Sequence, residues 1–455
     1  MPPASAKARA RAARTIAVLA LPVLLCPALP VCAADEPARA AEQPAQDLAV
    51  HGQWTTVVQS VGGFASPYAG DNSLLPHQTK ATSDVTLYLG ARAWPGAELW
   101  VNPEIDQGFG LSNTQGVAGF PSAEAYKVGK LAPYFKLQRA FLRQTLALGG
   151  QAQGVDAAIN QLRGHTTANR LVLTVGKFAV GDVFDTNRLA HDPRGDFLNW
   201  SLVDTGSFDY AANAWGYTYG LAGEWYQGPW TLRAGLFNLS RVPNGIALES
   251  GFGQNELVGE IERRARIGGR DGAIRLTVFR NRGRFARFDE ALAAPRAAGG
   301  VPDLSVARRR QDRVGVSVNA EQDVTASLGL FLRAGLSDGR FETYDFTDID
   351  RTLAVGGALK GSGWGRPTDT VGLAFVANGI AAARRRWLAA GGLGVIVGDG
   401  ALPHPGTEQI VEAYYAFRPA PWAAVTLDCQ HLANPGYNRD RGPATVFSVR
   451  LHAGF

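Results

Sequence analysis

The sequence is poor in the residue types that build most catalytic and metal centres. It contains three cysteines and seven histidines among 455 residues. Cys26 and Cys32 lie near the N-terminus, and Cys429 alone cannot form an internal disulfide. The histidines are scattered without the spacing of metal ligands, and no H-E-x-x-H motif occurs. We therefore predict no enzyme activity, no metal site and no cofactor.

Long apolar runs are equally scarce. Hydrophobic residues make up 46% of the chain, but beyond the N-terminal segment they never form the run of about 20 that a membrane helix needs. Without such a helix, only a closed β-barrel can cross a membrane. No linker-like change of composition divides the chain after residue 50, so residues 50–455 are predicted to form one large domain.

The N-terminal residues 1–33 have the organisation of an export signal. An apolar stretch at 15–25 follows the basic residues Lys7, Arg9, Arg11 and Arg14. Residues 34–49, rich in Ala, Glu, Pro and Gln, are predicted to be a disordered periplasmic lead-in. Removal of the signal lowers the formal net charge from +5 to +1, which argues against binding of nucleic acid.

The last residues of the chain alternate between apolar and polar side chains. The apolar stripe consists of Phe447, Val449, Leu451, Ala453 and Phe455. A terminal aromatic residue on such a stripe is similar to the closing strand of bacterial outer-membrane barrels, in which the stripe faces lipid and the other face lines a watery lumen. A soluble protein that ends on an edge strand is the alternative.

The same alternation recurs along the chain. In its clearest example Val85, Leu87 and Leu89 share one face, while Asp84 and Tyr88 share the other. Similar patterns occupy residues 170–176, 230–236, 274–278, 313–319, 327–333 and 425–430. A soluble β-sandwich would also alternate, because one face of each sheet is solvated. Alternation alone therefore does not identify a membrane barrel.

Connection lengths distinguish the two architectures. From a first strand near 54–59, long connections are predicted at 61–82, 106–133, 181–216, 239–255, 282–312, 337–351, 378–408 and 432–443. Short ones fall between them at 94–96, 227–229, 268–272, 321–323, 361–367 and 418–422, with 149–169 as a long exception. The pattern predicts an all-β, transmembrane antiparallel β-barrel of about 16 strands, with short periplasmic turns and long outer loops.

Two local features fit this arrangement. Five tryptophans and a tyrosine lie beside predicted short turns, as in an interfacial aromatic girdle: Trp94, Trp225, Tyr226, Trp230, Trp364 and Trp422. Tryptophans that simply pack near strand ends are the alternative. Residues 381–390 break the strand period and predict a short, solvated helix within an outer loop.

Several long motifs carry a family resemblance. They include Trp94-Pro95-Gly96-Ala97-Glu98-Leu99, Val175-Gly176-Lys177-Phe178, Phe184-Asp185-Thr186-Asn187, His191-Asp192-Pro193-Arg194, Phe197-Leu198-Asn199-Trp200 and Ala433-Asn434-Pro435-Gly436-Tyr437. Over nearly its whole mature length the chain resembles the carbohydrate-selective porins of the OprB family. The resemblance implies an outer-membrane channel of about 16 strands that passes sugars by diffusion.

Passage of a sugar needs donors, acceptors and flat groups close together, because a sugar presents many hydroxyls and apolar ring faces. The predicted inward faces supply such groups, although Phe141 leaves the orientation of the fourth strand open. The pore-lining candidates are Asp84, Tyr88, Arg92, Glu98, Trp100, Asn102, Glu104, Arg139, Arg143 and Lys177. For each charged residue, pairing with a neighbour that merely stabilises a polar lumen is the alternative.

The long connection 181–216 is dense in Asp, Asn, Arg and aromatic residues. A connection that folds into the barrel would narrow the pore, and the sequence leaves open whether this one does. Its candidates for lining or bracing the constriction are Asp182, Asp185, Asn187, Asp192, Arg194 and Asn199. A loop latched to the wall by its own salt bridges would use the same residue types. The spacing of these residues lacks the glycine and terminal glutamate of a calcium loop, so no metal is predicted.

These features predict a sugar channel in the bacterial outer membrane. The expected partners are mono- or disaccharides, outer-membrane lipid, and the barrel-assembly machinery acting on the C-terminal strand that ends at Phe455. A homotrimer is one option for the oligomeric state, which the sequence leaves open. A general or anion-preferring porin and a soluble exported glycan-binding β-protein are the alternative functions.

Overall fold

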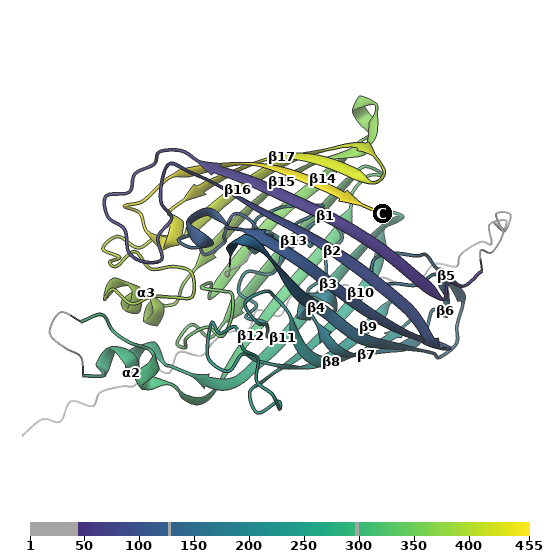
Figure 1. The fold of residues 1–455 in the computed structure, drawn as a ribbon, viewed down its shortest axis with the longest axis horizontal. Helices are drawn as coiled ribbons and strands as arrows, with labels where there is room; N and C mark the ends of the chain where they lie inside the picture. Colours follow the sequence, from purple (N-terminus) through teal and green to yellow (C-terminus); the bar gives the residue numbers. More distant parts are fainter. Residues whose placement is uncertain (1–43, 126–128, 296–299) are drawn as a thin grey trace, which may run out of the picture. The chain divides into compact units, whose positions relative to one another are not determined.

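A computed structural model describes residues 44–125, 129–295 and 300–455. Within Pro44–Phe455, 16 antiparallel strands form one closed barrel (Figure 1). The strands are β1 (Leu48–Val61), β2 (Gln78–Trp94), β3 (Ala97–Gly108), β4 (Lys130–Ala147), β7 (Arg170–Phe178), β8 (Thr218–Gln227), β9 (Trp230–Asn238), β10 (Asn255–Ile267), β11 (Arg270–Phe285), β12 (Arg309–Asp323), β13 (Leu328–Ser337), β14 (Arg351–Gly361), β15 (Arg366–Gly379), β16 (Glu408–Ala420), β17 (Ala423–Ala433) and β18 (Ala444–Gly454). The predicted strand number and pairing direction are confirmed.

The first and last strands close the barrel. β1 pairs with β18, so that Trp54 lies opposite Ala453 and Val58 opposite Val449. The backbone of Phe455 continues the ladder, because its N–H donates to the Gly52 carbonyl and its carbonyl accepts from the Gly52 N–H. β1 begins at Leu48, slightly before residue 50, where the sequence placed the start of the barrel domain. Gln46 and Asp47 accept hydrogen bonds from Arg92, so the described end of the predicted disordered lead-in is ordered.

The two faces of the strands carry opposite kinds of side chain. On β2, Val85, Leu87 and Leu89 are exposed on the outside, whereas Asp84 and Tyr88 are buried on the inside. This distribution is that of a transmembrane barrel, whose outer wall meets hydrocarbon. The predicted girdle tryptophans are all exposed near the short turns: Trp94, Trp225, Trp230, Trp364 and Trp422. The same prediction for Tyr226 is wrong, because its side chain lines a cavity inside the barrel. Among the described residues, none of the helices has the length and hydropathy that a membrane crossing needs.

The connections are sorted by length, as predicted. Apart from the connection at 149–169, the long ones gather at one end of the barrel, with the helices α2 (Phe288–Ala293) and α3 (Ala382–Ala389), and the short ones lie at the other (Figure 1). The long end is the extracellular side of a barrel of this type. The long loops also hold α1 (Trp200–Val203), η1 (Leu111–Asn113), η2 (Val180–Asp182), η3 (Ser305–Ala307) and η5 (Pro435–Tyr437), and η4 (Ser362–Trp364) forms a short turn.

The helix expected at 381–390 is present, and Arg385 and Arg386 on one face are exposed as expected, but its other face is buried. Arg384 is buried and donates to the carboxylates of Asp348 and Asp350. Trp387 is buried against Phe288 of α2, with ring centroids 5.7 Å apart. The helix therefore belongs to a packed cap over the barrel, formed where loops meet, which periodicity along one segment does not reveal.

Candidate functional site

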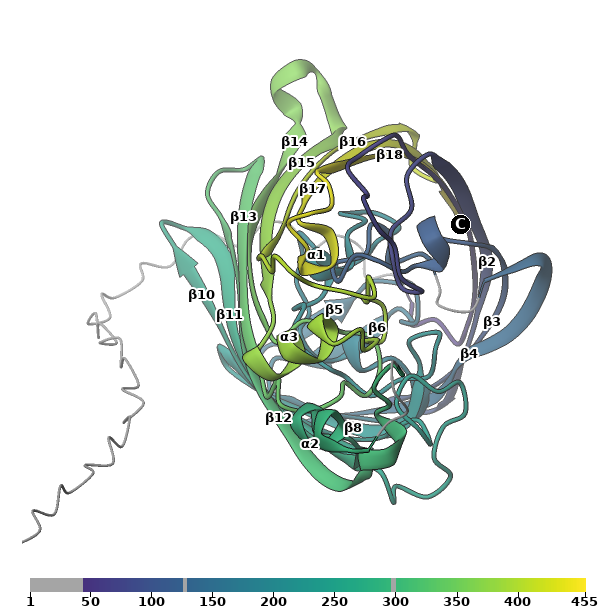
Figure 2. The ribbon, with the colours of Figure 1, turned by 90° about the vertical axis from the view of Figure 1, so that its left-hand side faces the viewer.

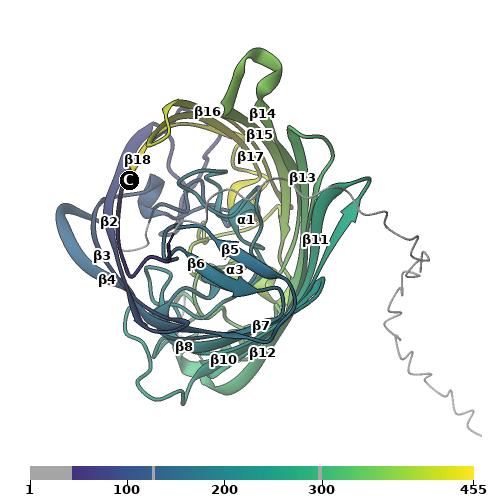
Figure 3. The same ribbon diagram turned by 90° about the vertical axis from the view of Figure 1, so that its right-hand side faces the viewer.

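Residues 179–217, which connect β7 and β8, fold into the barrel and form the body of the candidate site. α1, within this connection, lies inside the ring of strands when the barrel is viewed from either end (Figures 2 and 3). We call residues 179–217 the inner loop. Phe184, Phe197 and Leu202 of the inner loop are fully or almost fully buried, so it is packed rather than suspended in the lumen.

Arg333 of β13 is one anchor of the inner loop. Its guanidinium donates to the backbone carbonyls of Ala190 (2.6 Å), Asp185 (3.0 Å) and Leu202. Asp185 is itself held, because its side chain accepts from the backbone N–H and hydroxyl of Thr205 at 2.6 and 2.9 Å. A buried cation that satisfies three carbonyls from one loop fixes the path of that loop.

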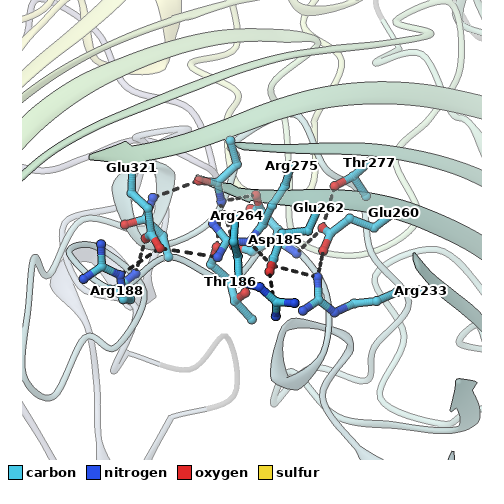
Figure 4. Close-up of polar contacts among 12 residues, drawn as sticks. Asp185, Thr186, Arg188, Arg233, Glu260, Glu262, Arg264, Arg275, Thr277 and Glu321 are labelled. Atoms are coloured by element: carbon cyan, nitrogen blue, oxygen red, sulfur yellow. Dashed lines mark hydrogen bonds and ion pairs between the residues drawn. The ribbon is translucent and has the colours of Figure 1, made fainter. Parts of the chain in front are cut away.

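A ladder of alternating charges on β9 to β12 forms a second anchor (Figure 4). Arg233 contacts Glu260 at 2.8 Å and Glu262 at 3.0 Å, and Arg275 contacts Glu262 at 2.9 Å. The inner loop joins both ends of this ladder. The backbone N–H of Asp185 donates to Glu260 at 2.8 Å, and Arg188 contacts Glu321 at 3.0 Å.

The opposite wall holds α1. The backbone N–H groups of Leu198 and Asn199 donate to the carboxylate of Glu412 on β16 at 2.6 and 2.9 Å. The Asn199 side chain accepts from the Ser201 N–H at the start of α1 and donates to Gln430 at 3.0 Å. Asn187 donates to Asn319 at 2.8 Å. Asp185, Asn187 and Asn199 therefore brace the loop from buried positions.

Other predicted residues lie on the open side of the inner loop. Asp182 accepts two bonds from the Arg139 guanidinium, from Nε at 2.7 Å and from Nη2 at 2.6 Å. Arg139 also lies over the ring of Tyr217, with its Cζ atom 4.8 Å from the centroid. The two side chains keep 14% and 28% of their surface exposed, so a solute can reach this ion pair.

Arg194 of the inner loop gathers carboxylates from three other segments. Its guanidinium lies 3.1 Å from Asp84 of β2, 3.5 Å from Glu104 of β3 and 3.3 Å from Glu124 in the connection between β3 and β4. Asp192 accepts from the Arg194 backbone N–H at 3.0 Å and shapes the turn that presents this guanidinium. Sequence reasoning found Asp84, Glu104 and Arg194, and the structure brings them together.

The loop carboxyl groups of the site differ in pKa. Burial raises the pKa of Asp182, but the Arg139 guanidinium outweighs it and holds that pKa below the ordinary value. Burial raises the pKa of Glu124 well above its usual range, although the Arg194 guanidinium acts against this. The guanidinium of Arg139 therefore favours the ionised form of Asp182, whereas burial favours the protonated form of Glu124.

Three cavities adjoin one another through shared lining residues. An outer cavity of about 160 Å³ is lined mainly by loops, and a middle cavity of about 420 Å³ by the wall and the inner loop. Both are lined by Asp182, His191, Pro193 and Arg194, which we call the constriction set. An inner cavity of about 380 Å³ shares Arg143, Gln161, Asp182 and Val183 with the middle one. Asp182 lines all three cavities.

The remaining predicted wall residues lie on the periplasmic side of the constriction set. Tyr88, Arg139 and Arg143 line the middle cavity, and Arg92 and Glu98 line the inner one. Arg139, Phe141 and Arg143 all face inward, because they pair with Asn102, Trp100 and Glu98 of β3. Trp100 and Asn102 are fully buried; Trp100 donates to Glu98 at 2.9 Å, so these two shape the wall beneath the lining.

Lys177 does not line the pore in this structure. It lies opposite Ala140 of β4 and Tyr219 of β8, and it shares the outward parity of the exposed Leu173 and Val175. Its ammonium group donates to the Leu137 carbonyl at 2.5 Å. The prediction for Lys177 is therefore wrong, and the alternation along β7, rather than its motif, indicates the true orientation.

Several lining residues escaped sequence reasoning. His191 precedes the predicted Asp192, and its ring nitrogens lie 3.0 Å from the Gly181 carbonyl and 3.3 Å from the Val203 carbonyl. Six aromatic residues line the outer cavity. Four of them belong to the inner loop, and the other two come from two different loops: Trp200, Tyr210, Trp215 and Tyr217, with Phe120 and Phe346. The density of aromatics in residues 181–216 was the available signal, but it did not single out members. Within the described ranges, no group of three His, Cys, Asp or Glu side chains is placed to hold a metal ion.

Comparison with known proteins places this geometry in a family. The family model described as "Carbohydrate-selective porin, OprB family" matches residues 72–455. No curated protein matches the sequence. Among solved structures, the high-pH structure of Pseudomonas putida OprB is similar with a TM-score of 0.68 and 17% identity, covering 90% of this chain and 94% of that one. The outer-membrane channel DcaP of Acinetobacter baumannii is matched with a TM-score of 0.49, 12% identity, and coverage of 90% and 97%.

These proteins are channels rather than enzymes, and the family match spans most of the chain. The matched region includes the whole inner loop and 15 of the 16 barrel strands, all except β1. The chain belongs to the OprB family of carbohydrate-selective porins and is a sugar-selective channel of the outer membrane.

Proposed function

We propose that neutral mono- and disaccharides diffuse through the outer, middle and inner cavities, and that the constriction set with Tyr88 and Arg139 selects them. The observation that carries this proposal is the sharing of Asp182, His191, Pro193 and Arg194 between the outer and middle cavities. A solute that passes from one cavity to the other contacts these residues. They supply guanidinium donors, a carboxylate acceptor and an imidazole within one narrow segment.

The chemistry of this segment suits a polyol more than an ion. The charges of Asp182 and Arg139 compensate each other in an ion pair of 2.6 Å, and the guanidinium of Arg194 is surrounded by carboxyl groups. A neutral sugar can exchange its water partners for these fixed donors and acceptors without leaving a charge unpaired. Above the constriction set, the aromatic residues of the outer cavity offer flat apolar surfaces to sugar rings.

The same residues argue against an anion-preferring porin, which remains the second candidate. An anion filter needs an excess of cationic side chains along the route. Here Arg194 alone meets Asp84, Glu104 and Glu124, and Arg143 lies 3.8 Å from Glu98. We infer that fixed charge along the route is largely compensated, so that hydroxyl recognition rather than net charge sets selectivity.

Planar-bilayer recording tests the proposal. The expected result is stepwise conductance that falls when glucose or maltose is added, with a smaller effect of sugars after Arg194→Gln. Arg282→Gln serves as the matched control, because Arg282 is exposed and its outward position opposite Asp312 lies away from the lumen. Channels whose conductance ignores both sugars would instead support a general porin.

Other parts of the proposal concern export and assembly. Residues 1–33 lie outside the described residues, and we propose that they are a cleaved export signal. We also propose that barrel-assembly machinery recognises the β18 strand through Phe455, whose side chain is 76% exposed, and that outer-membrane lipid covers the apolar wall. The structure contains one chain, and a homotrimer stays a prediction to be tested by size measurement in detergent.

A further inference from the structure

The connection at 149–169 is unusual because it joins two strands at the end of the barrel where other connections are short. It holds a two-stranded hairpin of its own, β5 (Ala152–Val155) and β6 (Gly164–Thr167), with residues 156–163 between them. Viewed from the periplasmic end, β5 and β6 lie inside the outline of the barrel (Figure 3). A simple turn would connect β4 and β7 equally well, so the extra residues call for another explanation.

The tip of the hairpin is bound to the inner wall. Arg143 of β4 donates to the Asn160 carbonyl at 2.7 Å, and Asn102 of β3 donates to the Asn160 side chain at 2.9 Å. Leu162 is 1% exposed and belongs to the same apolar cluster as Trp100. These contacts come from wall positions that face the lumen, so the tip reaches into the pore rather than into the periplasm.

The lead-in to β1 holds the other side of the hairpin. Arg92 donates to the Gln46 carbonyl at 2.7 Å and to the Arg163 carbonyl at 3.1 Å. Gln46 in turn donates its backbone N–H to the Arg163 carbonyl at 3.0 Å. The hairpin is therefore held by hydrogen bonds on two sides, which restrict its conformational freedom and define its inward position.

The hairpin tip forms part of the walls of both inner compartments. Ile159, Asn160 and Gln161 line the middle cavity, and Gln161 and Leu162 line the inner one. Gln161 and Arg143 therefore border both cavities, on the periplasmic side of the constriction set. On the proposed route, a solute that moves from the middle to the inner cavity contacts this pair.

We propose that the hairpin tip, residues 159–162, forms a second selectivity filter on the periplasmic side, in which Gln161 and Arg143 contact the sugar as it leaves. The inference rests on the proposed sugar route. An amide beside a guanidinium gives a donor-rich site with one carbonyl acceptor, which suits neutral sugar hydroxyls. The inner cavity then holds a sugar between the filter and the ladder residue Arg233, beside Tyr226 and Arg170, whose guanidinium lies 3.8 Å from the Tyr226 ring centroid.

Excision of the hairpin tests this filter. Removing residues 151–167 joins Gly150 to Ala168 and leaves the backbone bonds that link Leu148 and Gly149 to Asn169. Gly149 and Gly150 already have positive φ values of 95° and 87°, as a tight hairpin turn requires. If the filter contributes about as much resistance as the constriction set, conductance rises roughly twofold and sugar block becomes shorter-lived. Unchanged conductance and unchanged block would overturn the inference.

A cysteine variant tests the same filter without excision, in case the shortened chain does not assemble. In a Cys429→Ser background, Gln161→Cys places a thiol between the middle and inner cavities. A bulky thiosulfonate reagent added from the periplasmic side is expected to reduce the current by half or more. Gln153→Cys, on the exposed β5 strand, is the matched control and is expected to leave the current unchanged.

The sugar response of the unmodified channel separates the two proposals. If glucose reduces its conductance while modified Gln161→Cys conducts normally, the second filter is refuted and the sugar route stands. If glucose has no effect on the unmodified channel, the sugar route is refuted, and the proposed contact of Gln161 with sugar is refuted with it.

Discussion

The ion pair between Arg139 and Asp182 predicts a pair of opposite changes in ion selectivity. Arg139→Gln leaves the Asp182 carboxylate uncompensated, although the Ala179 N–H still donates to it at 2.9 Å. Asp182→Asn leaves the Arg139 guanidinium uncompensated. Both side chains line the middle cavity, so each variant changes the charge that a passing ion meets by one unit without removing a segment of the loop.

The expected size follows from Coulomb's law. A unit charge about 5 Å from an ion in water contributes about 0.8 kcal/mol. Screening in about 0.1 M salt reduces this to about 0.5 kcal/mol. That energy changes the local concentration of each ion about 2.3-fold. The concentration of ions of opposite sign to the uncompensated charge rises, and that of ions of the same sign falls. The cation-to-anion permeability ratio is therefore expected to change about fivefold, upward for Arg139→Gln and downward for Asp182→Asn.

Reversal potentials across a salt gradient measure this ratio. The double variant Arg139→Gln/Asp182→Asn restores neutrality and is expected to return the ratio close to that of the unmodified channel. Arg282→Gln again provides the control on the outer surface. A shift in the same direction for both single variants, or no shift in either, would refute the placement of this pair on the conduction route.

Three further predictions address the loop, the pH response and the wall. Arg333→Met removes three hydrogen bonds to inner-loop carbonyls, which is expected to destabilise the anchored loop by about 3–5 kcal/mol. We expect a larger conductance and faster proteolysis of residues 179–217. Resistance to proteolysis equal to that of the unmodified protein would contradict the role of Arg333 as an anchor. Because burial raises the pKa of Glu124, its protonated form stabilises the fold at low pH, and this stabilisation is lost as pH rises through the folded-state pKa. Over the same pH range, the side chain of Glu124 gains a negative charge. Cation selectivity should therefore increase with pH in reversal-potential titrations, and Glu124→Gln should remove the increase. Gly90→Ala would place a Cβ 2.4 Å from the Trp100 ring and is expected to destabilise the barrel by about 1–3 kcal/mol, seen as a lower temperature of heat modification, whereas Gly259→Ala, with its nearest atom at 3.8 Å, should not.

The architecture was predictable because its signals are local. Alternation along each strand follows from a wall with lipid on one side and water on the other. Phe455 illustrates this: its stripe predicted the closing strand, and its backbone pairs with Gly52 of β1. Loop lengths added the orientation, because short and long connections occupy opposite ends of the barrel.

The candidate site was only partly predictable because its contacts are long-range. Arg139 and Asp182 were both candidates, but their pairing depends on how deeply the inner loop enters the barrel. Tyr217 and Phe120 come from different loops and meet only in the folded outer cavity. Periodicity describes which way a strand residue points, but it contains no information on where a loop residue lies.

One residue and one segment show how a sequence signal can mislead or leave a structure unpredicted. Lys177 was among the predicted pore-lining residues, whereas the positions of Leu173 and Val175 already placed it on the lipid side. The length of residues 149–169 was a genuine anomaly, but its inward course depends on burial of Leu162 and on the bonds from Arg143 and Asn102. Neither partner can be inferred from the hairpin itself.

The central claim is that sugars pass along a route bounded by Asp182, His191, Pro193 and Arg194. Single-channel conductance of the unmodified protein in planar bilayers, recorded with rising concentrations of glucose, tests it most directly. The account predicts a saturable fall in conductance that weakens in Arg194→Gln and persists in Arg282→Gln. Conductance that follows only the viscosity of the glucose solution, equally in all three proteins, would contradict it.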